Sequence, residues 1–368
     1  MPINAKPEYY KAEKKYFEAS SIAEKLKALE GMLSKAPSHK GAETLRAGIK
    51  QKLAKFRGML EKERTKGKGQ GFSLTIKKEG AAQAMILSLT NAGKSSLLTK
   101  LTNAKPQIKH YEYTTEKPEV GIMEYNGVQI QLIELPAIFP DYAYRGNGPT
   151  YFSAMRNSDL IIFLIDLSKD INEQLEIIHG EFEKAQIKLN QERPPVEIKK
   201  TGVGGIEFSG RRFIKFDIKE ARKLLKENNF HNALIDIYGP VTIEQFADAL
   251  NESITYLPLL IIYNKSDIKG KGISCKTGEG VEEIKTDIWN SLGIIKVFTK
   301  QPGKEKEHPP IALKVGSQIK DIAQNVHKDF IKKFKFARVW GTSVKHPGNM
   351  VGLEHTLHDE DIVELHLK

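Results

Sequence analysis

The sequence predicts an α/β protein whose central domain is a mostly parallel sheet with helices on both faces. Apolar runs such as Met85–Leu87 and Leu259–Tyr263 have the length of buried strands, and a polar loop directly follows each of them. After the first loop, Ser95–Leu98 begins a helix. Buried strands that alternate with helices favour a parallel sheet, and the loops at the carboxyl ends of its strands form ligand sites.

The loop after the first strand has the pattern of a phosphate-binding loop. Residues 88–95 read S-L-T-N-A-G-K-S, which matches G-x-x-x-x-G-K-[ST] with Ser88 at the first glycine position. Lys94 would reach the β- and γ-phosphates, and the Ser95 hydroxyl would bind Mg²⁺. If Ser88 needs a positive φ, the cost is on the order of 1 kcal/mol, which would weaken phosphate binding. Backbone N–H groups at the start of the helix would bind the phosphates; their residues are Asn91, Ala92, Gly93, Lys94, Ser95 and Ser96.

The loop after the second strand predicts selection of guanine. Asn264, Lys265 and Asp267 form the pattern N-K-x-D. Asp267 would accept hydrogen bonds from guanine N1–H and N2–H₂, an edge that adenine does not present, and Lys265 would lie along the base and ribose. Further along, Ser274-Cys275-Lys276 resembles the S-A-K loop whose backbone contacts guanine O6. An ATP-using kinase is disfavoured by Asp267 and by the lack of a motif for substrate phosphorylation.

Two positions after the strand Ile130–Ile133 depart from the usual pattern of GTPases, D-x-x-G. Glu134 replaces the aspartate and is one methylene longer, so either the metal shell or the loop must shift. Ala137 replaces the glycine whose N–H contacts the γ-phosphate, and it lacks glycine's conformational freedom. Ile138 stands where Ras-like enzymes have the glutamine that orients the attacking water. Slow intrinsic turnover is therefore expected.

Candidate metal ligands come from two further places. Tyr113-Thr114-Thr115 resembles the first switch of GTPases, and Thr115 would be the second protein ligand of Mg²⁺ beside Ser95. Asn91 is a candidate ligand for K⁺. In GTPases with an apolar residue at the glutamine position, an asparagine two residues before the glycine-lysine pair is associated with a K⁺ bound next to the phosphates. Lys94, Thr115 and Glu134 are the predicted catalytic residues.

Several segments together resemble the developmentally regulated GTP-binding proteins (DRG), which are relatives of Obg. They are Tyr113-Thr114-Thr115, residues 121–127, 131–133, 188–195, 198–202 and 351–361. The resemblance implies a P-loop GTPase domain, an inserted α+β domain like part of a ribosomal protein, and a C-terminal TGS module of β-grasp fold. It also implies GTP or GDP as ligand, with Mg²⁺ and K⁺. The implied partners are the ribosome or ribosomal RNA, with a DRG-type regulatory protein as a further candidate.

The N-terminal boundaries follow from periodicity and composition, and the resemblance implies the inserted and TGS domains. Apolar stripes over 22–33 and 45–60 predict an N-terminal helical hairpin with a capping box at Ser21 and Glu24, and Lys66–Gly71 is a linker. We expect the hairpin and linker in 1–70, the GTPase domain in 71–168 and 252–294, the inserted domain in 169–251, and the TGS domain in 295–368. In the insert, Asp217 and Thr242 are predicted helix caps, and Ile198, Ile206 and Phe208 lie in strands around a glycine-rich turn.

Composition indicates the class of partner. The 368 residues carry a formal net charge of +11 with a pI near 9.3, which favours an anionic partner, with RNA as the leading candidate and DNA not expected. One cysteine suits a reducing compartment, and no apolar run is long enough to span a bilayer, so a cytoplasmic location is expected. Trp340 is either a core residue or a base-stacking one, and His355 and His358 suit the surface better than a zinc site.

Two hypotheses of function follow from these observations. The first is a Mg²⁺- and K⁺-dependent GTPase of low intrinsic activity that acts as a switch in translation. The second is a GTP- or GDP-binding scaffold that binds ribosomal RNA and does not hydrolyse GTP, in which Ser88, Glu134 and Ala137 mark lost activity.

Overall fold

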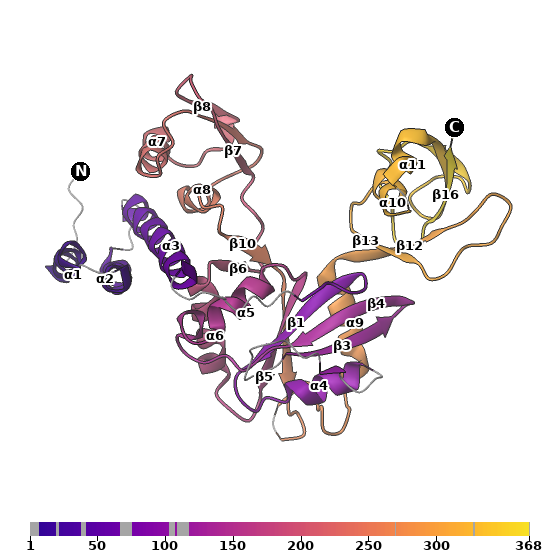
Figure 1. Cartoon of the computed structure of the whole chain (residues 1–368), viewed down its shortest axis with the longest axis horizontal. Coiled ribbons are helices and arrows are strands. Elements are labelled where there is room, and N and C mark those ends of the chain that lie inside the picture. The colour runs from indigo at the N-terminus through magenta and orange to yellow at the C-terminus, as the bar shows by residue number, and fades with distance from the viewer. Residues whose placement is uncertain are drawn as a thin grey trace. The chain divides into compact units, whose positions relative to one another are not determined.

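The computed structural model describes residues 7–19, 22–37, 42–66, 76–102, 107–108, 118–268, 270–326 and 328–367. The chain forms two compact units. Unit 1 comprises Met1–Phe72 and Phe182–Tyr256, and unit 2 comprises Ser73–Glu181 and Leu257–Lys368 (Figure 1). The predicted limits of the inserted domain, 169–251, differ from these boundaries, because most of the helix at 171–184 belongs to unit 2.

Unit 2 contains a six-stranded sheet with the order β11-β5-β1-β4-β3-β2. The strands β1 (Ala82–Ser88), β4 (Val128–Glu134), β5 (Leu160–Asp166) and β11 (Leu259–Asn264) are parallel neighbours, which confirms the mostly parallel sheet. The antiparallel edge consists of β3 (Glu119–Tyr125) and β2 (Gln107–Ile108). Because Ile86 pairs with Glu134 and Asn264 with Asp166, the carboxyl ends of the four parallel strands lie at one edge.

Helices bury the apolar strands of this sheet. The helices α4 (Lys94–Leu101) and α9 (Val281–Leu292) share one core cluster with β1 and β4, in which Leu98, Ile288 and Ile130 are fully buried. The remaining helices of the domain are η2 (Tyr142–Tyr144), α5 (Gly148–Met155) and α6 (Ile171–Lys184). β5 is buried along its whole length, as expected for a strand covered on both faces.

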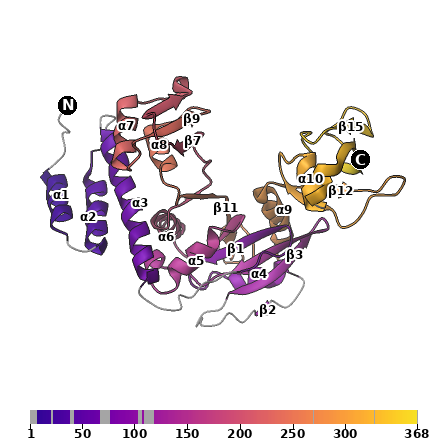
Figure 2. The ribbon, with the colours of Figure 1, turned by 45° about the horizontal axis from the view of Figure 1, so that its top comes forward.

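Within 7–19, 22–37 and 42–66, the described residues of the N-terminal part of unit 1, there are three helices where two were predicted. They are α1 (Pro7–Glu18), α2 (Ile22–Lys35) and α3 (Glu43–Lys66), which lie side by side in Figure 2. The apolar stripes of α2 and α3 form one core that includes Leu29 and Leu53. The helix α1 buries only Tyr9 and Ala12, too short a stripe to be recognised in sequence. Ser21, the predicted cap, and residues 67–71 of the predicted linker are outside the described residues.

The inserted part of unit 1 is an α+β fold. Its sheet has the order β7-β9-β8, from β7 (Val196–Lys200), β8 (Ile206–Ser209) and β9 (Ala233–Ile237), so the two predicted strands flank β9 and do not form a hairpin. A second pair joins β6 (Ile187–Leu189) to β10 (Thr255–Leu257). Both caps are found: Asp217 caps α7 (Ile218–Glu227), and Thr242 forms a capping box with Gln245 on α8 (Ile243–Ala249). A short 3-10 turn, η3, spans Arg211–Phe213.

The C-terminal part of unit 2 is a five-stranded mixed sheet with the order β13-β12-β16-β14-β15. Its elements are β12 (Ile294–Thr299), β13 (Ile311–Lys314), α10 (Ile319–Val326), α11 (Lys328–Lys333), β14 (Phe334–Trp340), β15 (Asn349–Val351) and β16 (Ile362–Leu367). Ile319 and Ile322 of α10 pack with Val297, Val339 and Val363. One face of the sheet is thus covered by α10.

Candidate nucleotide-binding site

The phosphate loop connects β1 to α4, in the order of strand, loop and helix that the sequence predicts. Asn91 and Gly93 adopt left-handed conformations, with φ of 64° and 97°, and α4 starts directly after Gly93. Ser88 is the last residue of β1 and has no positive φ, so the conformational cost considered for it does not apply. Its buried hydroxyl donates to the Leu89 carbonyl at 2.6 Å and accepts from Lys94 Nζ at 3.2 Å. Ser88 therefore holds the lysine that is expected to bind the phosphates.

Asn264 joins the phosphate loop to the two base-binding loops. It lies buried at the end of β11, where its Nδ2 donates to the carbonyl of Ala92 at 2.8 Å and its Oδ1 accepts from the N–H of Cys275 at 3.0 Å. A Cβ atom on Gly93 would lie 2.6 Å from Asn264 Nδ2. Glycine is thus required at 93 both for its φ and for the close approach of this amide.

Asp267, whose carboxylate would recognise guanine, is exposed and is held in place by a hydrogen bond from a buried residue. Ser274 is fully buried, and its hydroxyl donates to Asp267 Oδ1 at 2.7 Å while accepting from the N–H of Thr277 at 3.1 Å. Cys275 packs in the domain core, where burial raises the pKa of its thiol to about 11. Lys276 is exposed. The structure therefore brings Asp267 together with the loop at 274–276, as predicted.

Lys265 has a partner that sequence reasoning missed. Its ammonium lies 2.6 Å from Asp166 Oδ2, and Asp166, the last residue of β5, is fully buried. Burial alone would raise the pKa of Asp166, but hydrogen bonds from Lys265 and Ser168 outweigh it, so the pKa is below its ordinary range. Lys265 also has a φ of 71°, a conformation that costs a non-glycine residue some energy. A carboxylate at the end of an apolar strand was the signal available in sequence.

The predicted metal position consists of oxygen atoms from α4 and β4. Ser95 Oγ donates to Glu134 Oε1 at 2.9 Å, and Glu134 Oε2 is buried without a hydrogen-bond partner among the described residues. Burial raises the pKa of Glu134, and Glu119 adds to this effect, against the hydrogen bond from Ser95 and the charge of Lys94. A hydroxyl and a carboxylate with an unused oxygen fit the ligand preference of Mg²⁺.

The loop after β4 is fixed to the phosphate-loop strand. The N–H of Ile138 donates to the Ser88 carbonyl at 2.9 Å, and the Ile138 side chain is 1% exposed, while Ala137 is half-buried. A second contact not predicted from sequence is Lys169 Nζ, which donates to the carbonyl of Thr90 at 2.9 Å. Thr115, the predicted second Mg²⁺ ligand, is outside the described residues, as are Tyr113 and Thr114.

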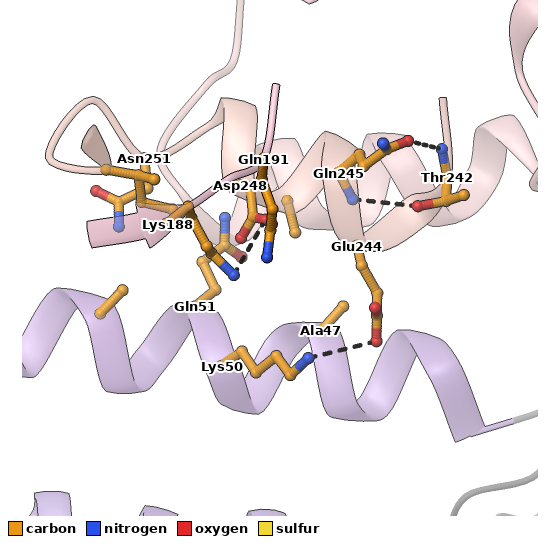
Figure 3. A pocket seen from close by; sticks show the side chains of 13 residues that line it. Ala47, Lys50, Gln51, Lys188, Gln191, Thr242, Glu244, Gln245, Asp248 and Asn251 are labelled. Atoms are coloured by element: carbon orange, nitrogen blue, oxygen red, sulfur yellow. Dashed lines mark hydrogen bonds and ion pairs between the residues drawn. The ribbon is translucent and has the colours of Figure 1, made fainter. Parts of the chain in front are cut away.

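A polar cavity of about 350 Å³ lies in unit 1 between α3, α8 and the start of the inserted domain (Figure 3). Ion pairs at 3.5 Å join Lys50 to Glu244 and Lys188 to Asp248. Burial raises the pKa of Asp248 despite the charge of Lys188. The cavity shares no residue with the nucleotide site. Its charged lining residues already form ion pairs with one another, so it is a polar contact region within unit 1 and a poor match for a polyphosphate.

Three other residues singled out from the sequence, Trp340, His355 and His358, each contact a neighbouring side chain. Trp340 is half-buried, with Lys300 Nζ 3.7 Å from its ring centre. His355 Nε2 lies 3.0 Å from the hydroxyl of Ser343, and His358 Nδ1 is 3.3 Å from that of Thr342.

Within the part of the chain that the structure describes, every helix is too short or too polar to cross a bilayer.

Comparison with known proteins matches family models to three parts of this architecture. Residues 83–200 match the family described as 50S ribosome-binding GTPase, 203–294 match the C-terminal region of that domain, and 295–367 match the TGS domain. An uncharacterised GTP-binding protein of Methanocaldococcus jannaschii is 34% identical, with 94% of this chain and 93% of that protein covered. The developmentally-regulated GTP-binding protein 2 homolog of Dictyostelium discoideum is 30% identical, with 94% and 99% covered.

A solved structure, a GTP binding protein from Pyrococcus horikoshii, aligns over 78% of this chain and 100% of its own with 13% identity and a TM-score of 0.41. The fold and the site define a P-loop protein that binds guanine nucleotides. Since relatives of at least 30% identity span nearly the whole chain, it belongs to the family of developmentally regulated GTP-binding proteins.

Proposed function

We propose that this GTP-binding protein is a slow, Mg²⁺- and K⁺-dependent GTPase that acts as a ribosome-associated switch in translation. The observation that carries the proposal is the position of Ile138, which is buried and held by the Ser88 carbonyl beside the phosphate loop. Ras-like enzymes use a glutamine at this place to orient the attacking water. An apolar side chain cannot orient water, so rapid turnover requires a group from another loop, a cation or a partner.

The residues of this chain suggest how the charge on the phosphates would be stabilised. Lys94 and the N–H groups at the start of α4 bind the β- and γ-phosphates. Ser95 and Glu134 would hold Mg²⁺, with Thr115 as a further ligand, and the ion would neutralise phosphate charge when bound. Asn91 is exposed at the rim of the phosphate loop, where its amide oxygen could bind K⁺.

The ribosomal part of the proposal rests on charge and on family. The net charge of +11 favours an anionic partner such as ribosomal RNA, and residues 83–200 match a family described as 50S ribosome-binding GTPase. A DRG-type regulatory protein remains a proposed second partner. A cytoplasmic location would suit both partners and the single cysteine.

A second candidate function, a GTP- or GDP-occupied scaffold that binds ribosomal RNA without hydrolysis, is favoured by the burial of Glu134. Burial raises the pKa of this carboxyl group and so opposes the charged form that a metal needs, while Ser95, as the hydrogen-bond donor to Glu134, keeps the lone pairs of its hydroxyl oxygen. Single-turnover GTP hydrolysis in K⁺ or Na⁺ buffer, with and without ribosomes, separates the two functions. We expect K⁺ and ribosomes each to raise the rate; GTP binding without hydrolysis in all four conditions would support the scaffold.

A further inference from the structure

The sheet of the TGS domain has one face that α10 does not cover. Val297, Val339 and Val363 point to the core beneath α10, and because side chains alternate along a strand, their neighbours point to the opposite face. We call this the outer face of the TGS sheet. Its residues on β14 and β16 include Phe336, Arg338 and Trp340 of β14 and Glu364 and His366 of β16, and Lys300, which follows β12, lies against Trp340 and Glu364.

Aromatic rings on the outer face are arranged in an ordered way. Phe336 and His366 are directly paired across β14 and β16, and their rings are stacked with centroids 4.3 Å apart and an interplanar angle of 18°. The imidazole Nε2 of His366 lies 2.6 Å from Glu364 Oε1, which fixes the orientation of its ring. Both rings are half-buried, so part of each remains accessible to solvent.

Trp340, the residue singled out from sequence, is less suited to stack on a ligand than this pair. Lys300 Nζ lies 3.7 Å from its ring centre. On Gly348, with a φ of 77°, a Cβ atom would come within 3.3 Å of Trp340 ring atoms, so that backbone is already packed against the indole. The stacked pair Phe336 and His366 is therefore the aromatic surface of this face that a planar ligand could extend.

The exposed charge on the outer face is positive. Arg338 and Lys335 are exposed, and Lys300 is held in place by Trp340 and Glu364. The pairing of β14 with β16 is irregular between Phe334 and Phe336, and there Lys335 Nζ lies 6.0 Å from the centre of the Phe336 ring, on the side of the outer face. The one carboxylate among the central residues, Glu364, is 5% exposed and accepts from both Lys300 and His366. Stacking rings next to cations match a single-stranded nucleic acid, whose bases are open for stacking and whose phosphates are negative; a duplex hides its base faces.

We propose that the outer face of the TGS sheet binds single-stranded RNA, with a base stacked on the Phe336–His366 pair and phosphates bound by Arg338 and Lys335. This inference rests on the proposed function and identifies the surface and the RNA form that it uses. The bases are contacted by ring faces, which every base possesses, so binding is tolerant of sequence. An acidic protein would match the cations equally but would gain nothing from the stacked rings.

The test uses the full chain with a fluorescein-labelled ten-nucleotide oligouridine, measured by fluorescence anisotropy, and a duplex RNA of the same length. Phe336→Ala removes the stacking surface and should weaken oligouridine binding about tenfold, within the range known for stacking on aromatic side chains. Phe336→Leu, which keeps an apolar side chain on the sheet, should lose nearly as much. The matched control is Tyr238→Ala, another aromatic residue, 64% exposed in unit 1, which should bind as the wild type does.

Salt dependence tests the phosphate contacts separately. For single strands, each lost phosphate contact lowers the slope of log affinity against log salt by about 0.7, so Lys335→Gln and Arg338→Gln should each do so while Phe336→Leu leaves the slope unchanged. Equal binding of Phe336→Leu and wild type, or equal affinity for duplex and single strand, would overturn the stacking proposal. Competition by polyglutamate as strong as that by oligouridine would instead identify an acidic protein as the partner and overturn it too.

Co-sedimentation with ribosomes keeps this inference distinct from the proposed function. If the wild type co-sediments with ribosomes but does not bind oligouridine, the inference fails and the proposed function stands. If oligouridine binding depends on Phe336 while co-sedimentation is absent, the proposed function fails and the assignment of this surface stands. Binding of GDP by each variant reports whether the chain is folded.

Discussion

Asp166 gives the sharpest prediction about nucleotide binding, because it is fully buried and its one carboxylate holds the lysine of the guanine motif. In Asp166→Asn the side chain keeps its shape and loses its charge, so the contact of 2.6 Å with Lys265 Nζ loses its ionic character. A hydrogen bond to a charged group contributes about 1.5–3 kcal/mol. Because the side chain of Lys265 is 27% exposed, water compensates in part, and the lower end of that range, about 1.5–2 kcal/mol, is the reasonable expectation.

If Asp166 must hold Lys265 in place for the lysine to lie along the base, the free energy lost in Asp166→Asn lowers the affinity for nucleotide by the same amount. About 1.5–2 kcal/mol corresponds to a rise in the Kd of GDP of roughly 10- to 30-fold. The Kd is measured by titration of a fluorescent GDP analogue. Asp170→Asn is the matched control: it makes the same change four residues further on, at an exposed position whose carboxylate caps α6, and asparagine caps equally well.

A double-mutant cycle with Lys265→Met isolates the pair from general effects on stability. If Asp166 acts through Lys265, Asp166→Asn should have little further effect on GDP affinity once Lys265→Met is present, giving a coupling energy above about 1 kcal/mol. Additive losses would mean that Asp166 stabilises the loop independently of Lys265. An unchanged or tighter Kd in Asp166→Asn alone would refute the positioning role.

Three further predictions concern selectivity, metal and charge. GTP and GDP should bind at least about 10²-fold tighter than ATP, because guanine would donate two hydrogen bonds to the charged Asp267 and adenine none, and each bond to a charged group contributes about 1.5–3 kcal/mol. Asp267→Asn should relax this preference, and equal titration curves for ATP and GTP would contradict it. Ser95→Ala should lower Mg²⁺-dependent affinity for GTP, whereas Glu134→Asp should preserve or raise hydrolysis. Burial raises the pKa of Glu134 in the folded state, so its protonation contributes folding stability at low pH, and this contribution is lost as the pH rises through that pKa. Mg²⁺-dependent GTP binding should strengthen over the same pH interval, because the carboxylate becomes charged there. Identical GTP binding in Mg²⁺ and in EDTA at every pH would exclude this metal position. Removal of residues 295–368 should weaken salt-sensitive co-sedimentation with ribosomes, and an unchanged salt profile would refute a role for the TGS domain there.

Local patterns in the sequence were sufficient for much of the site. The phosphate loop is marked by a glycine with positive φ directly before a lysine, and the guanine loop by N-K-x-D directly after an apolar strand. Each pattern consists of residues that are adjacent in sequence, so both loops could be predicted directly. The pair of Asp166 and Lys265 could not, because it joins positions 99 residues apart through the register of β5 and β11. The same limit applies to β9, which separates β7 from β8, since strand order depends on long-range pairing.

The departures at Ser88 and Glu134 act on the same small group of side chains. Ser88 accepts from Lys94, and Glu134 accepts from Ser95, so each unusual residue holds one of the two neighbours that would bind phosphate and metal. Glutamate is one methylene longer than the usual aspartate, and its carboxylate makes this direct hydrogen bond across from β4 to α4. Neither hydrogen bond removes a group needed for binding, because the ammonium of Lys94 has three N–H donors and the Ser95 hydroxyl keeps its lone pairs when it donates. The two departures therefore preserve the groups expected to bind phosphate and metal, and what they change is the side chain that holds each of those groups in position.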